Sequence, residues 1–214
     1  MPVGKLIQQA NTTMILRYSP TSPYVRKVSV VISELGLSEQ IERIATDPWN
    51  PETDLAAQNP LGKVPTLITD SGQVLFDSHV ICEYLDGLHC GPRLFPSEPK
   101  ARIQALQLEA LGDGVLDAAV LAFIEAQRRP EARRWAVWGS RQRAAIDRSL
   151  AWLTEHMDLL GSQLHVGHLT VGCALGYLDF RLADLNWPER YPGLAGWYVE
   201  FSGRESMRET IPSG

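Results

Sequence analysis

Three hydroxyl side chains stand close together just before a proline in the stretch SPTSPYVRKV, residues 19–28. Ser22 is followed directly by Pro23, a residue type that favours the first turn of a helix. A hydroxyl at such a point can cap the helix. It can also donate a hydrogen bond to a negatively charged group at the positive end of the helix dipole. Ser19 and Thr21 are alternative donors if the loop folds differently.

A second polar pair follows an apolar run in LFDSHVICEYL, residues 75–85. Asp77 and Ser78 stand where the spacing of apolar residues predicts the start of a helix, so Ser78 can cap that helix. The first turn of a helix leaves backbone N–H groups unpaired, and together with the dipole these groups favour a bound anion. The pair is therefore a plain helix cap, part of a binding site, or both.

A proline at the start of a predicted strand marks a third position, in NPLGKVPTL, residues 59–67. The missing N–H of Pro65 costs least at the beginning of a strand. A trans proline in an edge strand with no ligand is one interpretation of this pattern.

The elements that position these residues begin with strand-like runs at MILRY (14–18) and IERIAT (41–46), with a helix from Tyr24 to Leu35 between them. The runs VPTLIT and QVLFDS flank a D-S-G turn, which predicts an antiparallel hairpin, and a helix follows directly. A βαβ unit followed by a ββα unit is the pattern of an α/β thioredoxin-like domain.

The rest of the chain lacks strand character. HCGPRLFPSEP (89–99) holds three prolines and a glycine, which is typical of an interdomain linker. Helical patterns follow, and TVGCALGYLDFRLADL is apolar nearly all round, so we expect that helix to be buried. The predicted organisation is an N-terminal extension (1–13), the α/β domain (14–88), a linker (89–100) and an all-α helical bundle (101–214).

Composition limits the class of protein. The 214 residues are 44% hydrophobic and 21% charged, as in ordinary globular proteins, and no apolar run reaches the roughly 18 residues of a membrane-spanning helix. A net charge of −5 argues against nucleic acid as the main partner, because phosphate-binding surfaces are usually basic. Cys82, Cys90 and Cys173 form no metal-ligand pattern, so we expect no metal. Reduced thiols and the lack of a signal-peptide pattern indicate a cytoplasmic protein.

Four stretches, in order and at these separations, resemble the soluble glutathione S-transferases: SPTSPYVRKV, NPLGKVPTL, LFDSHVICEYL and GCALGYLDFR. The resemblance covers essentially the whole chain from Met14 and is strongest to bacterial members with a serine in the active-site loop. It implies a thioredoxin-like domain followed by an all-α bundle, with the tripeptide glutathione as co-substrate. It also implies a homodimer and a pocket between the domains for a small apolar electrophile.

The resemblance also assigns roles to individual residues. Ser22 holds the position that touches the sulfur of glutathione, where its hydroxyl donates a hydrogen bond and favours the reactive thiolate. The Val64–Pro65 bond is implied to be cis, which leaves the Val64 backbone free to pair with the cysteinyl backbone of glutathione. Asp77 would accept from the α-ammonium of the γ-glutamyl end, and Ser78 would hold its α-carboxylate. Two further candidates for contacts to glutathione are Tyr24 and Lys63.

A serine at position 22 excludes thioredoxin-like disulfide exchange, which needs an attacking thiolate from the protein at that place. Conjugation remains, as does the reduction of peroxides or disulfides with the thiol of glutathione itself. A different class of function is a non-catalytic or regulatory binding protein of the same fold, such as a factor that binds RNA polymerase. The intact set of Ser22, Val64-Pro65 and Asp77-Ser78 favours a transferase.

Other charged residues carry simpler expectations. Arg26 and Lys27 are expected to face solvent on the first helix, and His79 is expected at the surface. Lys63 is either a solvated lysine or close enough to bind the glycyl carboxylate of glutathione. The candidate lining of the electrophile pocket is Tyr18, Leu111, Asp113, Val115, Asp117 and Trp187.

The start of the apolar helix departs from the family pattern. The family usually begins this helix with Ser/Thr-x-x-Asp, a capping motif, whereas here the two positions hold His165 and His168. Neither histidine is a preferred cap, so we expect weaker capping and an altered response to pH. No third ligand is visible beside them, so we do not expect a metal there.

Overall fold

The computed structural model describes residues 13–161 and 163–213, so nearly all of the predicted N-terminal extension (1–13) lies outside the described residues. A four-stranded sheet with the order β2-β1-β3-β4 forms the first part of the fold. Strand β1 pairs in parallel with β2 and antiparallel with β3, and β3 and β4 form an antiparallel hairpin. The strands are β1 (Met14–Tyr18), β2 (Ile41–Ala45), β3 (Thr66–Ile68) and β4 (Val74–Leu75).

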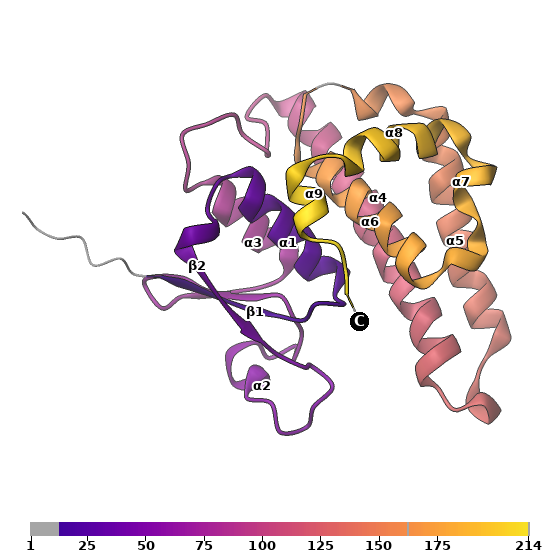
Figure 1. Cartoon of the computed structure of the whole chain (residues 1–214), viewed down its shortest axis with the longest axis horizontal. Helices are drawn as coiled ribbons and strands as arrows, with labels where there is room; N and C mark the ends of the chain where they lie inside the picture. The colour runs from indigo at the N-terminus through magenta and orange to yellow at the C-terminus, as the bar shows by residue number, and fades with distance from the viewer. Residues whose placement is uncertain (1–12, 162, 214) are drawn as a thin grey trace, which may run out of the picture.

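Helices cover both sides of this sheet. Helices α1 (Pro23–Glu34) and α3 (Ser78–Asp86) lie on one face, and the short helix α2 (Leu55–Gln58) lies on the other (Figure 1). Val28 and Ile32 of α1 are fully buried against the strands, as their helical spacing predicts. The thioredoxin-like arrangement expected from the order of the elements is confirmed.

The remainder is helical, as expected, and two of its helices, α4 (Pro99–Phe123) and α6 (Val166–Arg181), pack closely together. At Gly112 a Cβ atom would stand 2.8 Å from Cγ2 of Thr170, so only glycine permits this approach. After the last helix, the chain returns toward the start of α1 (Figure 1). Within the described residues, no helix is both long and apolar enough to cross a membrane. The helices are α4 (Pro99–Phe123, continued by a π-helical turn at Ile124–Arg128), α5 (Ala136–Glu155), α6 (Val166–Arg181), α7 (Trp187–Arg190), α8 (Pro192–Ser202) and α9 (Glu205–Glu209).

Buried ion pairs join the part of the fold that contains the sheet to the helical part. The expectation that Arg26 and Lys27 face solvent is wrong, because α4 and α6 cover the side of α1 that the sheet leaves open. Lys27 is fully buried, and its Nζ lies 2.8 Å from Asp113 and 3.3 Å from Glu109, both on α4. His79 on α3 is half-exposed, and its Nδ1 lies 2.8 Å from the other oxygen of Glu109. This hydrogen bond raises the pKa of His79.

Two imidazoles cap α6. The backbone N–H of Gly167 donates to Nδ1 of His165 at 3.1 Å, and the N–H of His165 donates to Nδ1 of His168 at 3.3 Å. The expectation of weaker capping is therefore wrong, because both imidazoles accept hydrogen bonds from backbone N–H groups at the start of the helix. A neutral imidazole presents one acceptor nitrogen, which here takes the place of the hydroxyl and the carboxylate of the usual capping box.

A cap made of imidazoles should fail in acid, because a protonated imidazole cannot accept a hydrogen bond. Burial lowers the pKa of His165 to about 4 and also lowers the pKa of His168. The unfolded chain, with histidine pKa values of about 6.5, then binds more protons than the folded one as the pH falls. This contribution to stability is complete above about pH 6.5 and is lost toward about pH 4. We expect a loss on the order of 1–2 kcal/mol, after discounting the partial exposure of His165.

Denaturant unfolding of wild type and of the double variant His165→Ser, His168→Gln across this pH range measures the effect. The variant keeps a capping box without a titratable group, so the free energy of unfolding should fall less in acid than that of wild type. His79, whose raised pKa acts in the opposite direction, is common to both proteins and cancels in the comparison. Equal pH dependence in the two proteins would contradict this role for the histidines.

Candidate functional site

The loop after β1 places Ser22 at the N-terminus of α1. Its Oγ accepts a hydrogen bond from the N–H of Val25 at 3.3 Å, and its own N–H donates to the carbonyl of Ser19 at 3.2 Å. The hydroxyls of Ser19 and Thr21 lie 3.4 Å apart and do not cap the helix. Because the Ser22 oxygen acts as an acceptor in the cap, its proton remains available for donation to another group.

The segment before Pro65 is held by a buried asparagine. Nδ2 of Asn59 donates to the carbonyl of Lys63 at 2.9 Å and to Oγ1 of Thr66 at 3.1 Å. Gly62, with a φ of +60°, supplies the left-handed residue that this turn requires. The N-P-L-G-K pattern therefore fixes the backbone that leads into Val64.

Val64 presents unpaired backbone groups. The Val64–Pro65 peptide bond is cis, as predicted. Val64 is 8% exposed, yet neither its N–H nor its carbonyl has a hydrogen-bond partner within the described part of the chain. An unpaired N–H and carbonyl on one residue at the start of a strand are the groups with which an extended peptide can pair.

Asp77 and Ser78 form the start of α3. The Asp77 carboxylate accepts a hydrogen bond from the N–H of His79 at 3.0 Å through Oδ1, which makes Asp77 the N-cap in place of the expected Ser78. The Asp77 side chain is exposed, so its second oxygen can bind a cation. Ser78 is 5% exposed in the first turn of the helix, beside the unpaired backbone N–H groups. The Phe76–Asp77 bond is also cis.

Tyr24 and Lys63, the other two residues predicted to contact glutathione, lie in different surroundings. The Tyr24 hydroxyl donates to the Asp117 carboxylate of α4, and burial raises the pKa of Tyr24. Tyr24 thus joins α1 to the helical bundle, and its proton is already engaged. The Lys63 side chain is exposed on the loop before Val64.

The predicted lining of the electrophile pocket is partly wrong. Val115 and Trp187 are each 1% exposed inside the core of the bundle, because both fall on faces where helices pack together. Asp113 is paired with Lys27, and Asp117 with Tyr24.

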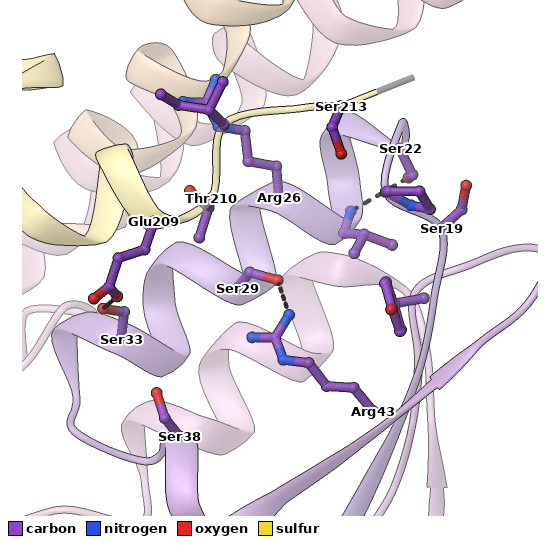
Figure 2. Close-up of a pocket in the computed structure, with 14 residues that line it drawn as sticks. Ser19, Ser22, Arg26, Ser29, Ser33, Ser38, Arg43, Glu209, Thr210 and Ser213 are labelled. Atoms are coloured by element: carbon purple, nitrogen blue, oxygen red, sulfur yellow. Dashed lines mark hydrogen bonds between the residues drawn. The ribbon is translucent and has the colours of Figure 1, made fainter.

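A hollow of about 260 Å³ adjoins Ser22 between α1, β2 and the C-terminal segment 209–213 (Figure 2). The sequence analysis missed most of this hollow, because the C-terminal segment that closes it is distant along the chain. Tyr18 is the one residue of the predicted pocket lining that it contains. Its other lining residues include Ser19, Ser22, Arg26, Ser29, Arg43 and Thr210.

Comparison with known proteins identifies the family. The model of the glutathione S-transferase N-terminal domain matches residues 21–88, and the model of the C-terminal domain matches residues 136–200. The protein named "Uncharacterized GST-like protein YibF" of Escherichia coli (strain K12) is 36% identical over 197 residues, which are 91% of this chain and 96% of that protein. The chain belongs to the glutathione S-transferase family.

Solved structures of other glutathione S-transferase family members share the whole architecture. A family member from Pseudomonas fluorescens Pf-5 with bound glutathione is 43% identical, with a TM-score of 0.91, over 94% of this chain and all of that chain. A structure from the same organism with bound S-(propanoic acid)-glutathione is 44% identical, with a TM-score of 0.86 and the same coverage.

Proposed function

We propose that this glutathione S-transferase family member is an active glutathione transferase, which presents the thiol of glutathione as a thiolate to a small electrophile. The observation that carries this proposal is the buried Val64, whose backbone N–H and carbonyl are unpaired beside the cis Pro65. The bound glutathione of a relative that is 43% identical supports it. The proposal includes a homodimer, as the sequence resemblance implies, and a cytoplasmic location, as the cysteine content of the sequence indicates.

Three parts of the N-terminal domain hold the tripeptide. The Val64 backbone pairs with the cysteinyl backbone, as in the addition of one short strand. The free oxygen of Asp77 accepts from the α-ammonium, and Ser78 with the first-turn amides of α3 binds the α-carboxylate. Lys63 binds the glycyl carboxylate, and Tyr24 supports α1 through its hydrogen bond to Asp117.

Ser22 acts on the sulfur of the bound glutathione. A free cysteine thiol has a pKa of about 8.5, so most of it is protonated at neutral pH, whereas the thiolate is the nucleophile. Ser22 donates its proton in a hydrogen bond to the sulfur, at the positive end of α1, and so favours the thiolate. Each unit by which this thiol pKa falls corresponds to about 1.4 kcal/mol. The thiolate then forms a bond to the electrophilic carbon while the protein supplies proximity and charge stabilisation.

The sequence resemblance predicts that the electrophile is apolar. The bound S-(propanoic acid)-glutathione of a relative that is 44% identical supports a site with room for a small substituent on the sulfur.

Binding to immobilised glutathione, followed by turnover with an aryl halide, tests the proposal. We expect the protein to be retained, to elute with free glutathione, and to conjugate the halide faster than the uncatalysed reaction. A protein that is not retained would favour the non-catalytic binding protein. Retention without conjugation, but with consumption of an organic hydroperoxide, would favour the glutathione-dependent reductase.

A further inference from the structure

The turn that joins α4 to α5 concentrates positive charge. Between residues 128 and 141, a segment that we call the α4–α5 tip, five arginines stand against one glutamate, although the net charge of the whole chain is −5. All five guanidinium groups are on exposed residues: Arg128, Arg129, Arg133, Arg134 and Arg141. Within residues 13–161 and 163–213, Arg129 alone among them forms an ion pair, to Glu125 at 2.9 Å. The tip therefore presents positive charge that the protein leaves mostly uncompensated.

Exposed apolar side chains lie among these arginines. Trp135 is 61% exposed and Val137 is 67% exposed, and the ring of Trp135 stacks on Trp138 with centroids 6.2 Å apart. Trp49, in the loop after β2, is 63% exposed, and the Arg128 guanidinium lies 6.0 Å from the centre of its ring. All six tryptophans are described, and the two that are exposed, Trp49 and Trp135, are both found here. Exposed apolar side chains that gather on one surface mark a place of interaction.

A buried carboxylate fixes the shape of the tip. Glu125 is 6% exposed, accepts a hydrogen bond from the N–H of Trp135 at 2.5 Å and pairs with Arg129. Nε of Arg134 donates to the carbonyl of Arg129 at 3.2 Å. The turn projects from the end of the helical part, at the lower right of Figure 1. Its exposed side chains are thus held in place before any partner arrives, which lowers the entropic cost of binding.

A projecting turn with these side chains fits the surface of an anionic lipid bilayer. Tryptophan prefers the bilayer interface, because its ring is buried there while its N–H stays hydrated. Arginine can place its apolar stem beside the rings and donate charge-assisted hydrogen bonds to lipid phosphates. Charges are screened beyond about 8 Å at physiological ionic strength, so a flat bilayer that meets only the tip is little affected by the negative charge elsewhere on the protein.

An acidic polypeptide is the competing partner. It would match the positive charge of the tip, but it would bury less of Trp135 and Val137, because these side chains project from a turn. The hollow beside Ser22 and a second one of about 390 Å³, which Gly176 and Ile211 help to line, contain no residue of the tip. A fluid bilayer interface can surround projecting side chains without a groove, so the geometry favours lipid.

We infer that the α4–α5 tip attaches the protein to an anionic lipid membrane, with Trp135 and Val137 in the bilayer interface and the arginines on lipid phosphates. The attachment is peripheral and reversible, because only a few apolar side chains enter the bilayer. The inference is independent of the proposed transferase activity, since the residues proposed to hold glutathione lie outside the tip.

Flotation of the full chain with lipid vesicles tests the inference. We expect the partition coefficient to be at least about tenfold higher for phosphatidylcholine vesicles that contain about one-third phosphatidylglycerol than for phosphatidylcholine alone, and to fall as salt is added. Arg133→Gln with Arg134→Gln should lower binding to the mixed vesicles on the order of 20-fold, since one arginine near the surface contributes about fivefold. Trp135→Ser with Val137→Ser should lower it too, and should reduce the quenching of tryptophan fluorescence by brominated lipid.

The matched control is Lys100→Gln with Arg208→Gln, which removes two exposed cations from the start of α4 and from α9, outside the tip. It should partition as wild type does, and circular dichroism shows that each variant is folded. Equally weak flotation of wild type with both kinds of vesicle overturns the inference, as does a control variant that loses as much binding as the arginine variant. Binding to soluble polyglutamate as tight as to the mixed vesicles, without quenching by brominated lipid, overturns it in favour of an acidic polypeptide. Retention on immobilised glutathione tests the transferase separately from all of these outcomes.

Discussion

Replacement of Lys27 by methionine should lower the free energy of unfolding by about 3–5 kcal/mol, the usual cost of removing one partner from a buried ion pair. Lys27 is fully buried, and Glu109 is 2% exposed, so water cannot replace the lost ammonium group. Burial already raises the pKa of Asp113, whose carboxylate would lose its cation. Urea unfolding followed by circular dichroism at neutral pH measures the loss.

A control and a second variant separate this effect from the general cost of a mutation. Lys100→Met removes an exposed ammonium group at the start of α4 and should change stability by no more than about 0.5 kcal/mol. The double variant Lys27→Met, Asp113→Asn should have a higher free energy of unfolding than Lys27→Met alone, because it leaves one fewer charge without a partner. A loss for Lys27→Met as small as that for Lys100→Met would show that these ion pairs do not hold the two parts together.

Asp77→Asn should weaken the binding of glutathione by roughly 10- to 150-fold, the range for a lost hydrogen bond between charged groups. Asparagine keeps an oxygen that can accept from the N–H of His79, so the cap of α3 and the fold remain. It loses the negative charge that would pair with the α-ammonium of the γ-glutamyl end. The measurement is the dissociation constant of glutathione by calorimetry.

A glutathione analogue without the α-amino group makes this test specific. Wild type should bind the analogue about as weakly as Asp77→Asn binds glutathione, and the mutation should have little further effect on the analogue. If the mutation weakened both ligands equally, Asp77 would act through the structure of α3 and not through the ammonium group.

Local patterns were sufficient to predict most of the fold and the backbone of the candidate site. Apolar residues at helical spacing located α1, which buries one face, and short β-rich runs located β1 and β2. The helix starts at Ser22 and near Asp77 also follow from short motifs whose geometry depends on adjacent residues. The cis bond before Pro65, in contrast, was implied by the resemblance to the family.

The features that the sequence analysis missed depend on contacts between distant parts of the chain. Arg26 and Lys27 are buried because α4 and α6, which lie far along the chain, cover that side of α1. The sequence of α1 did contain a signal of this burial, because the adjacent cations Arg26 and Lys27 interrupt a helix that is otherwise apolar on several sides. The imidazole caps at His165 and His168 were missed because preferences for capping residues favour hydroxyl and carboxylate side chains.

The role of Ser22 is measured most directly by the ultraviolet absorbance of the thiolate of bound glutathione during a pH titration. With wild type, the bound thiol should ionise at a pH well below the value of about 8.5 for a free thiol. Ser22→Ala should still bind glutathione, but its bound thiol should ionise about one pH unit or more higher, and Ser19→Ala should behave as wild type. Identical thiolate titrations for wild type and Ser22→Ala would contradict the proposal that Ser22 stabilises the thiolate.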